Sequence, residues 1–197
     1  MLASAFKRVA LLGLRARVSV EGMAAVVRYL RNPAPDLTVG VLRRYGATIG
    51  AQARFKGSLF LDNVWEDEHS AGDLRHLVVG DNCYIGDSVY FDLAHEVVIE
   101  SNVVVSARAA LVTHQDCNRS PFLSGVFARR GEGIRLGSGA WVGFGATILA
   151  GSVVGADAAI AAHALVRDDV PPRTLSAGVP ARRVRGLSPG PSSEAEL

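Results

Sequence analysis

The sequence predicts an all-β solenoid, in which short strands stack as successive coils behind a helical cap. This prediction rests on a six-residue repeat, on two loops that interrupt it, and on a different composition over the first forty residues. The repeat is clearest in the last third of the chain, where aliphatic residues recur at Leu136, Val142, Ile148, Val154, Ile160 and Val166. A fixed short period indicates stacked repeats, and a period of six fits neither an alternating strand nor a 3.6-residue helix.

Each six-residue unit is expected to form a short strand and a tight corner, so that three units close one triangular coil of about eighteen residues. The aliphatic residue fills the coil interior. A small residue four positions later fits where the walls converge, at Ala140, Ala146, Ser152, Ala158, Ala164 and Val170. Glycine follows the aliphatic residue at Gly137, Gly143 and Gly155, where we expect corner geometry that a side chain would resist.

Residues 1–40 precede the repeat and are expected to form the helical cap that the open end of a solenoid requires. Within them, residues 2–30 mix apolar residues with Lys7, Arg8, Arg15, Arg17 and Arg28, and Arg31 follows directly. A second interpretation therefore stays open, in which this segment is a basic amphipathic helix on an anionic membrane surface. No segment of the sequence has an apolar run long enough to span a membrane.

The solenoid is predicted to cover residues 41–185 in about five coils. The same phase recurs in three earlier groups, which are Ile49, Phe55 and Leu61, then Val79, Ile85 and Phe91, then Ile99, Val105 and Leu111. Two loops interrupt it, a polar one at 65–77 and one at 113–133 that also carries apolar residues. Long loops in compact domains are usually either functional or disordered, and the apolar residues of the second loop favour a function. Residues 186–197 are predicted to be a disordered tail.

Composition narrows the classes of function. The chain has 197 residues and a net charge of only +2, which is too small to argue for a nucleic-acid partner. Two cysteines do not make a disulfide framework. A reducing cytoplasm is the simplest setting, at the inner face of the membrane if residues 2–30 bind lipid.

One stretch carries a family resemblance. Residues 139–155 read GAWVGFGATILAGSVVG, followed by VRDDVPP at 166–172 and AGVPAR at 177–182. This run resembles the hexapeptide-repeat acyltransferases, and its ending looks like the sugar O-acetyltransferases that include the galactoside, maltose and polysaccharide enzymes. The resemblance implies a left-handed parallel β-helix, acetyl-CoA as co-substrate without a metal, and a homotrimer with its active sites between subunits.

Acetyl transfer to a hydroxyl needs a base, because a hydroxyl is a poor nucleophile at neutral pH. His114 lies where a coil ends and the second loop begins, which is where the similar enzymes carry their catalytic histidine, so we assign it as general base. Asp92, His95 and Asp116 are the residues predicted to bind the acceptor. Asp116 is also the nearest candidate in sequence to orient the imidazole.

The resemblance also implies a binding surface for the donor. Five positions match the family's residues near the pantetheine, the thioester and the phosphates of CoA, where cations are expected: Trp141, Ala162, Arg167, Arg182 and Arg185. Two departures stand out, because Arg167 is followed by aspartate where relatives commonly have Thr-Lys, and Phe144 stands where a smaller polar residue is common. For Arg182 and Arg185, a solvated basic terminus is the alternative interpretation.

The sequence therefore favours an acetyl-CoA-dependent O-acetyltransferase acting on a sugar hydroxyl of a polysaccharide or glycoconjugate. An N-acetyltransferase that uses a nucleotide-linked aminosugar is an alternative, because fold does not decide the acceptor. His76, His95 and His114 are nineteen residues apart, which leaves open a zinc lyase similar to the γ-class carbonic anhydrases. A non-enzymatic β-helix scaffold is the remaining alternative.

Overall fold

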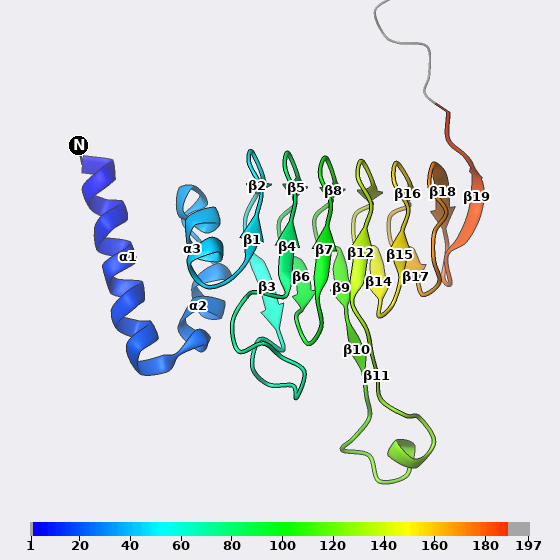
Figure 1. The fold of residues 1–197 in the computed structure, drawn as a ribbon, viewed down its shortest axis with the longest axis horizontal. Helices are drawn as coiled ribbons and strands as arrows, with labels where there is room; N and C mark the ends of the chain where they lie inside the picture. Colours follow the sequence, from blue (N-terminus) through cyan, green and yellow to red (C-terminus); the bar gives the residue numbers. More distant parts are fainter. Residues whose placement is uncertain (1, 189–197) are drawn as a thin grey trace, which may run out of the picture.

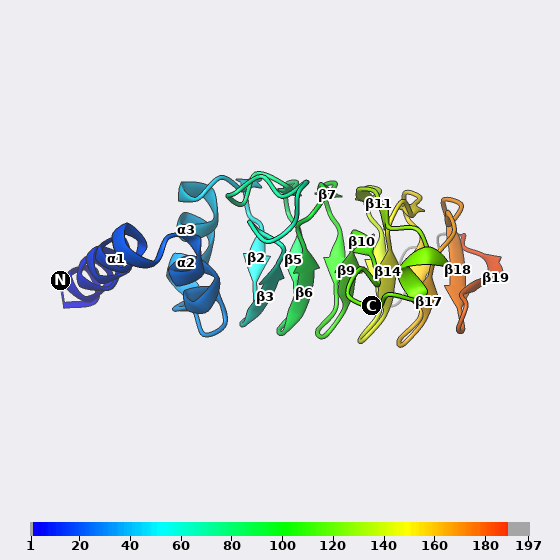
Figure 2. The same ribbon diagram turned by 90° about the horizontal axis from the view of Figure 1, so that it is seen from below.

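Helices close one end of the solenoid. The computed structural model describes residues 2–188, and their side chains from residue 9 onward. The helical segments are α1 (Leu2–Glu21), α2 (Met23–Leu30), a 3₁₀ turn (Pro35–Leu37) and α3 (Thr38–Arg44). Fully buried Val26, Leu30, Val41 and Leu42 belong to α2 and α3, which contact the first coil. α1 lies outside them, at the far end of the molecule (Figures 1 and 2). The helical region ends at Arg44, beyond the predicted limit at residue 40.

Three parallel sheets form the walls of the solenoid, with one strand from each sheet in each coil. The first wall holds β1 (Thr48–Ile49), β4 (Leu77–Val79), β7 (Val97–Ile99), β12 (Ile134–Leu136) and β15 (Val153–Val154). The second holds β2 (Arg54–Phe55), β5 (Tyr84–Ile85), β8 (Val104–Val105), β13 (Trp141–Val142), β16 (Ala159–Ile160) and β18 (Thr174–Ala177), with β19 (Arg182–Gly186) antiparallel at its edge. The third holds β3 (Leu59–Asp62), β6 (Val89–Asp92), β9 (Ala110–Val112), β14 (Thr147–Leu149) and β17 (Leu165–Val166).

The interior is built from the residues that the repeat predicts. Strand pairing places the aliphatic residues of each wall in register, and in the third wall the ladder runs through Leu61, Phe91, Leu111, Ile148 and Val166. All fifteen aliphatic or aromatic positions of the repeat are buried, and so are the small residues four positions later in the last coils. This prediction is confirmed. A six-residue period directs the side chain at the same position of every unit into the interior of the coil.

The glycines after the aliphatic positions serve a purpose different from the predicted one. Left-handed backbone occurs two residues further on, at Gly139 and Gly145, with φ of 72° and 64°. At Gly137 and Gly143 the reason is close approach of the next coil. A Cβ on Gly137 would lie 2.7 Å from the backbone nitrogen of Ala156, a distance that real Cβ atoms essentially never show. Glycine is thus required there by coil spacing and not by φ.

The far end of the solenoid closes with a hairpin. β19 pairs with β18, and the Leu187 N–H donates a hydrogen bond to the Arg173 carbonyl at 2.7 Å. Residues 186–188 are therefore ordered, contrary to the predicted boundary of the tail, because β19 continues through Gly186. The rest of the predicted tail, 189–197, lies outside the described residues. Across residues 2–188, no helix is long and apolar enough to cross a membrane.

Candidate active site

Both long loops leave the solenoid at the same corner. Each follows a strand of the third wall, the first after β3 and the second after β9. The second starts as a short antiparallel hairpin of β10 (His114–Gln115) and β11 (Arg130–Gly131) that projects away from the coils (Figure 1). Because parallel strands of one wall end at the same edge, loops from the first and third coils emerge on one side. Residues far apart in sequence meet there.

His114 and Asp92 form the centre of this corner. His114 Nδ1 lies 2.6 Å from Asp92 Oδ2. The same oxygen accepts hydrogen bonds from the backbone N–H groups of Thr113 at 2.8 Å and His114 at 3.0 Å. The Asp92 side chain is 1 % exposed, whereas that of His114 is 20 % exposed. The buried carboxylate thus fixes both the His114 ring and the adjoining backbone through hydrogen bonds, while the ring itself stays accessible to solvent.

The protonation state of Asp92 follows from its bonds. Burial alone raises the pKa of this carboxyl, but hydrogen bonds from His114, Ala94 and Asn63 outweigh burial and leave the pKa below its ordinary value. An ionised carboxylate accepts hydrogen bonds and donates none. His114 Nδ1 therefore carries the proton in the Asp92 contact. The lone pair of the neutral ring is then on Nε2, where it can accept a proton from a substrate.

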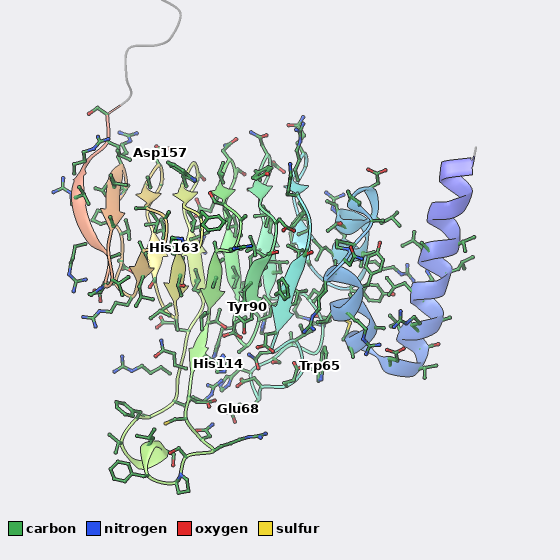
Figure 3. The ribbon with its side chains drawn as sticks, turned by 180° about the vertical axis from the view of Figure 1, so that it is seen from behind. Trp65, Glu68, Tyr90, His114, Asp157 and His163 are labelled. Atoms are coloured by element: carbon green, nitrogen blue, oxygen red, sulfur yellow. The ribbon has the colours of Figure 1, made fainter. Side chains whose placement is uncertain are left out.

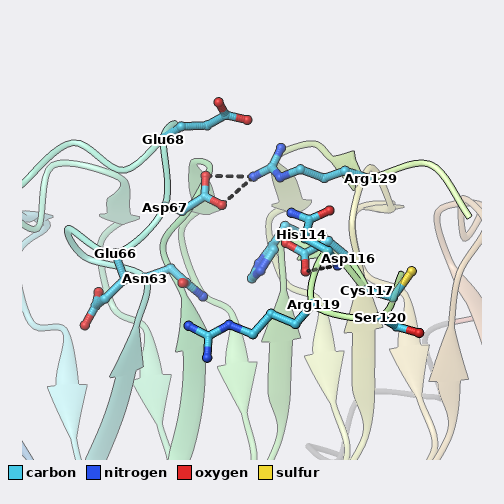
Figure 4. Close-up of a pocket in the computed structure, with 11 residues that line it drawn as sticks. Asn63, Glu66, Asp67, Glu68, His114, Asp116, Cys117, Arg119, Ser120 and Arg129 are labelled. Carbon is cyan, nitrogen blue, oxygen red and sulfur yellow. Dashed lines mark hydrogen bonds and ion pairs between the residues drawn. The ribbon is translucent and has the colours of Figure 1, made fainter. Parts of the chain in front are cut away.

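A cavity of about 800 Å³ opens beside His114 (Figure 4). Its lining comes from both loops and is largely polar: Asn63, Glu66, Asp67, Glu68, His114, Asp116, Cys117, Asn118, Arg119, Ser120 and Arg129. Figure 3 shows Glu68 and Trp65 on the first loop, on the same side of the solenoid as His114. Such a cavity suits a hydrophilic ligand, because hydroxyl groups find donors and acceptors around it.

An ion pair joins the two loops across the cavity. Arg129 Nη2 lies 2.6 and 2.7 Å from the two carboxylate oxygens of Asp67, and both side chains are mostly buried. Burial raises the pKa of Asp67, but the His69 N–H and the Arg129 guanidinium more than offset this effect and lower the pKa to about 2. This ionised pair fixes the base of the second loop against the first.

Asp92 requires a correction to its predicted role. The sequence predicted that it would hold the acceptor. In the structure Asp92 accepts five hydrogen bonds from protein groups and has almost no exposed surface, so it orients His114 instead. Asp116 is exposed and lines the cavity, which keeps it a candidate for acceptor binding. The described contacts of Asp116 include no bond to the imidazole, so the orienting role belongs to Asp92.

His95 is not one of the residues that line the cavity beside His114. Its backbone N–H donates to Thr113 Oγ1 at 3.1 Å, and its ring lies against that of His69 with centroids 4.9 Å apart. Its Nε2 is buried without a hydrogen bond. Burial lowers the pKa of His95, and the charges of His69 and Arg129 lower it further. His95 therefore does not contact the cavity beside His114, and its role in binding the acceptor stays a prediction.

The predicted donor-binding residues lie elsewhere on the chain. Trp141 is 54 % exposed on the second wall, with its Nε1 donating to Ser106 Oγ at 3.0 Å. Ala162 is exposed at the next corner, and Arg182 and Arg185 are exposed on β19. Arg167 borders a second cavity, whose lining also includes residues 129–132 of the second loop. Within one chain, then, Trp141 lies on the second wall, whereas His114 lies in the hairpin that follows the third wall.

The three histidines considered for zinc do not gather. His76 Nδ1 contacts the Leu93 carbonyl at 3.0 Å, and His95 Nε2 is buried with no partner. Within the described part of the chain, the group of potential metal ligands that lie close together is Asp67, His114 and Asp116. Asp67 is already paired with Arg129. The spacing of nineteen residues between these histidines therefore does not produce a three-histidine zinc site.

Sequence reasoning missed Asn63, Asp67 and Arg129. Asn63 has φ of 51° at the start of the first loop and donates to Asp92 Oδ1 at 3.0 Å. Asparagine adopts this left-handed backbone conformation more readily than most residues do. The sequence alone does not show that Asn63 adopts it. Asp67 and Arg129 are 62 residues apart in two loops without periodicity, and no sequence pattern connects them.

No family model matches the chain, and no curated protein matches it. Solved structures do. A galactoside acetyltransferase in complex with coenzyme A is 20 % identical with a TM-score of 0.70, covering 89 % of this chain and 83 % of that one. A hexapeptide-repeat acetyltransferase from Vibrio cholerae is 18 % identical with a TM-score of 0.71, covering 91 % and 94 %. A maltose O-acetyltransferase from Clostridium difficile is 18 % identical with a TM-score of 0.63, covering 86 % of each chain.

These similarities confirm the predicted fold, a left-handed parallel β-helix of hexapeptide repeats with an N-terminal helical region. These three solved structures are acetyltransferases, the class of enzyme that the hexapeptide repeat of this chain resembles. At this level of identity, the likeness concerns the fold. The activity has to be argued from the residues at the corner.

Proposed function

We propose that this chain transfers an acetyl group from acetyl-CoA to a sugar hydroxyl, with His114 as general base. The observation that carries the proposal is the buried Asp92 carboxylate, 2.6 Å from His114 Nδ1, beneath a ring that faces a polar cavity. An imidazole held in this way is a typical general base. The similarity in fold to CoA-binding acetyltransferases supports the choice of donor.

His114 Nε2 removes the proton of the attacking hydroxyl while the hydroxyl oxygen bonds to the thioester carbonyl carbon. The carbon–sulfur bond then breaks, and the same nitrogen returns the proton to the departing thiolate. Between these steps the ring is positively charged. The ionised Asp92 stabilises this imidazolium and keeps its Nε2 directed at the cavity. No covalent intermediate with the protein is needed.

The acceptor is proposed to be a sugar of a polysaccharide or glycoconjugate, because the cavity wall offers carboxylates, amides and two guanidinium groups to sugar hydroxyls. One observation favours a second candidate, an amine on a nucleotide-linked aminosugar. Carboxylates outnumber guanidinium groups on the wall by four to two, which attracts a cationic group: Glu66, Asp67, Glu68 and Asp116 against Arg119 and Arg129. A panel containing neutral sugars and aminosugars separates the two.

We further propose that the site is completed by a neighbouring subunit of a homotrimer, whose Trp141 and Ala162 face His114. This is supported by the position of Trp141 on a wall that is different from the His114 corner, and by its 54 % exposure. Arg167, Arg182 and Arg185 would then bind the CoA phosphates. Mixing His114→Ala and Trp141→Ala proteins tests the idea, because mixed trimers contain intact sites and regain activity, whereas sites within one chain give no recovery.

Thermal unfolding of the wild type and His114→Ala, each with and without acetyl-CoA, tests the donor. A ligand that binds only the native state raises its melting temperature. We expect equal stabilisation of both proteins, because His114 is assigned to proton transfer and not to donor binding. If neither protein is stabilised, the acyltransferase proposal fails and the non-enzymatic scaffold becomes the better account.

The proposed cellular setting is a reducing cytoplasm. Two free cysteines, Cys83 and Cys117, support it.

A further inference from the structure

α1 carries apolar residues on two opposite sides. Leu11, Leu14 and Val18 are spaced three and four residues apart, lie on its inner side and pack against the hydrophobic core. Val9, Leu12 and Val20 are 67 %, 61 % and 85 % exposed. At about 100° per residue these three fall within one narrow stripe, on the side opposite the inner one. Within the described residues, nothing covers this outer stripe.

The charge of the chain is divided unequally. Residues 2–44 contain eight basic and two acidic residues, a net charge of +6. Residues 45–197 contain thirteen basic and seventeen acidic residues, a net charge of −4. The exposed Arg15 and Arg17 flank the outer stripe on its two sides. Arg17 is also paired with Glu21 at 3.3 Å. An apolar stripe bordered by long cationic side chains is the arrangement of a helix that lies in a membrane interface.

We propose that α1 lies on an anionic phospholipid surface, with Val9, Leu12 and Val20 at the headgroup–acyl boundary and Arg15 near the lipid phosphates. The alternative occupant, a second copy in symmetric contact, would bring two caps of net charge +6 together, which like-charge repulsion disfavours. A bilayer with anionic headgroups matches both the apolar stripe and the sign of the charge. The helix lies on the surface and does not cross it.

The placement of α1 gives this contact a consequence for the site. Figures 1 and 2 both show α1 at the end of the solenoid, outside α2 and α3, and Figure 1 shows it running across the long axis. When its outer side rests on a bilayer, the coils stack away from the surface. The His114 corner, where the loops of the first and third coils meet, then lies in the half of the solenoid that is nearer to the membrane. An acceptor attached to lipid by a flexible linkage could reach it there.

Vesicle flotation with the full chain tests the proposal. We expect the protein to float with vesicles of phosphatidylcholine and phosphatidylglycerol but not with phosphatidylcholine alone, and to be released by salt. The double variant Val9→Ser/Val20→Ser should lower the partition coefficient about 100-fold, or roughly tenfold per valine. The matched control is Val179→Ser/Val184→Ser, whose valines are 71 % and 59 % exposed near the opposite end of the solenoid. This control should float as the wild type does.

Three results would overturn the proposal. The first is absence of flotation with the anionic vesicles. The second is equal flotation of the two double variants, which would place any lipid contact elsewhere on the protein. The third is a lower oligomer mass for Val9→Ser/Val20→Ser in light scattering without lipid, which would make the outer stripe an interface between copies. Unchanged circular dichroism of both variants shows that the fold is kept, as expected for exposed positions.

Discussion

Asp92→Asn removes a negative charge while keeping the shape of the side chain. In the wild type, Oδ2 accepts hydrogen bonds from the N–H groups of Thr113 and His114 and from the His114 ring. Oδ1 accepts from the Ala94 N–H and from the Asn63 amide. All five partners act as donors to the carboxylate. An asparagine must therefore direct its own NH₂ group at donors on one side or the other.

The magnitudes follow from these bonds. If the amide oxygen takes the place of Oδ2, two hydrogen bonds to the other atom are lost inside the protein, which costs about 2–3 kcal/mol of stability. The imidazolium formed during the reaction also loses an ionic partner. A hydrogen bond to a charged group contributes about 1.5–3 kcal/mol. We therefore expect kcat to fall by about 10- to 100-fold, with little change in the affinity for acetyl-CoA.

Thiol release from acetyl-CoA measures kcat, and thermal unfolding measures stability. Ile85→Val is the control, because it loses about 1 kcal/mol in the second wall, away from the corner, and should keep its activity. A variant Asp92→Asn that is less stable but has the wild-type kcat would refute the role of Asp92 in catalysis. Unchanged stability of Asp92→Asn would contradict the five hydrogen bonds assigned to the Asp92 carboxylate.

Three predictions concern stability. The depressed pKa of Asp67 means that its ionised carboxylate, held by the His69 N–H and by Arg129 together, contributes up to about 2 kcal/mol above pH 3.8, lost as the pH falls toward 2. Acid-unfolding curves should therefore be steeper for the wild type than for Asp67→Asn, and parallel curves would contradict the pair. Gly86→Ala should cost about 1–3 kcal/mol in thermal unfolding, because its Cβ would lie 2.4 Å from the Ala107 nitrogen. Ser152→Ala should raise the melting temperature or leave it unchanged, because Ser152 Oγ is buried without a hydrogen bond, and a lower one would show an undetected partner.

The fold was largely predictable because its interior depends on a local period. Each residue such as Leu136 or Ile148 is buried by the same corner-and-strand geometry as the one six positions away. The role of glycine was less predictable. Whether Gly137 is needed for its φ or for the approach of the next coil depends on the distance between coils, which no local pattern encodes.

The site was predictable only where it continues the repeat. His114 ends a counted coil, and Asp92 was correctly placed about one coil away, but the direction of its carboxylate depends on the strand end and was misjudged. Asp67 and Arg129 belong to loops without a period, so their contact depends on the three-dimensional path of both loops. Residues that sit on the repeat can be located from sequence, whereas pairings between its interruptions cannot.

Acetyl transfer by the wild type and His114→Ala tests the central claim most directly. Both proteins receive acetyl-CoA and a panel of neutral sugars and aminosugars, and both thiol release and the acetylated product are measured. We predict that the wild type acetylates at least one sugar and that His114→Ala loses about 100-fold or more of that rate, the usual contribution of a general base. Transfer by His114→Ala at the wild-type rate would contradict the account.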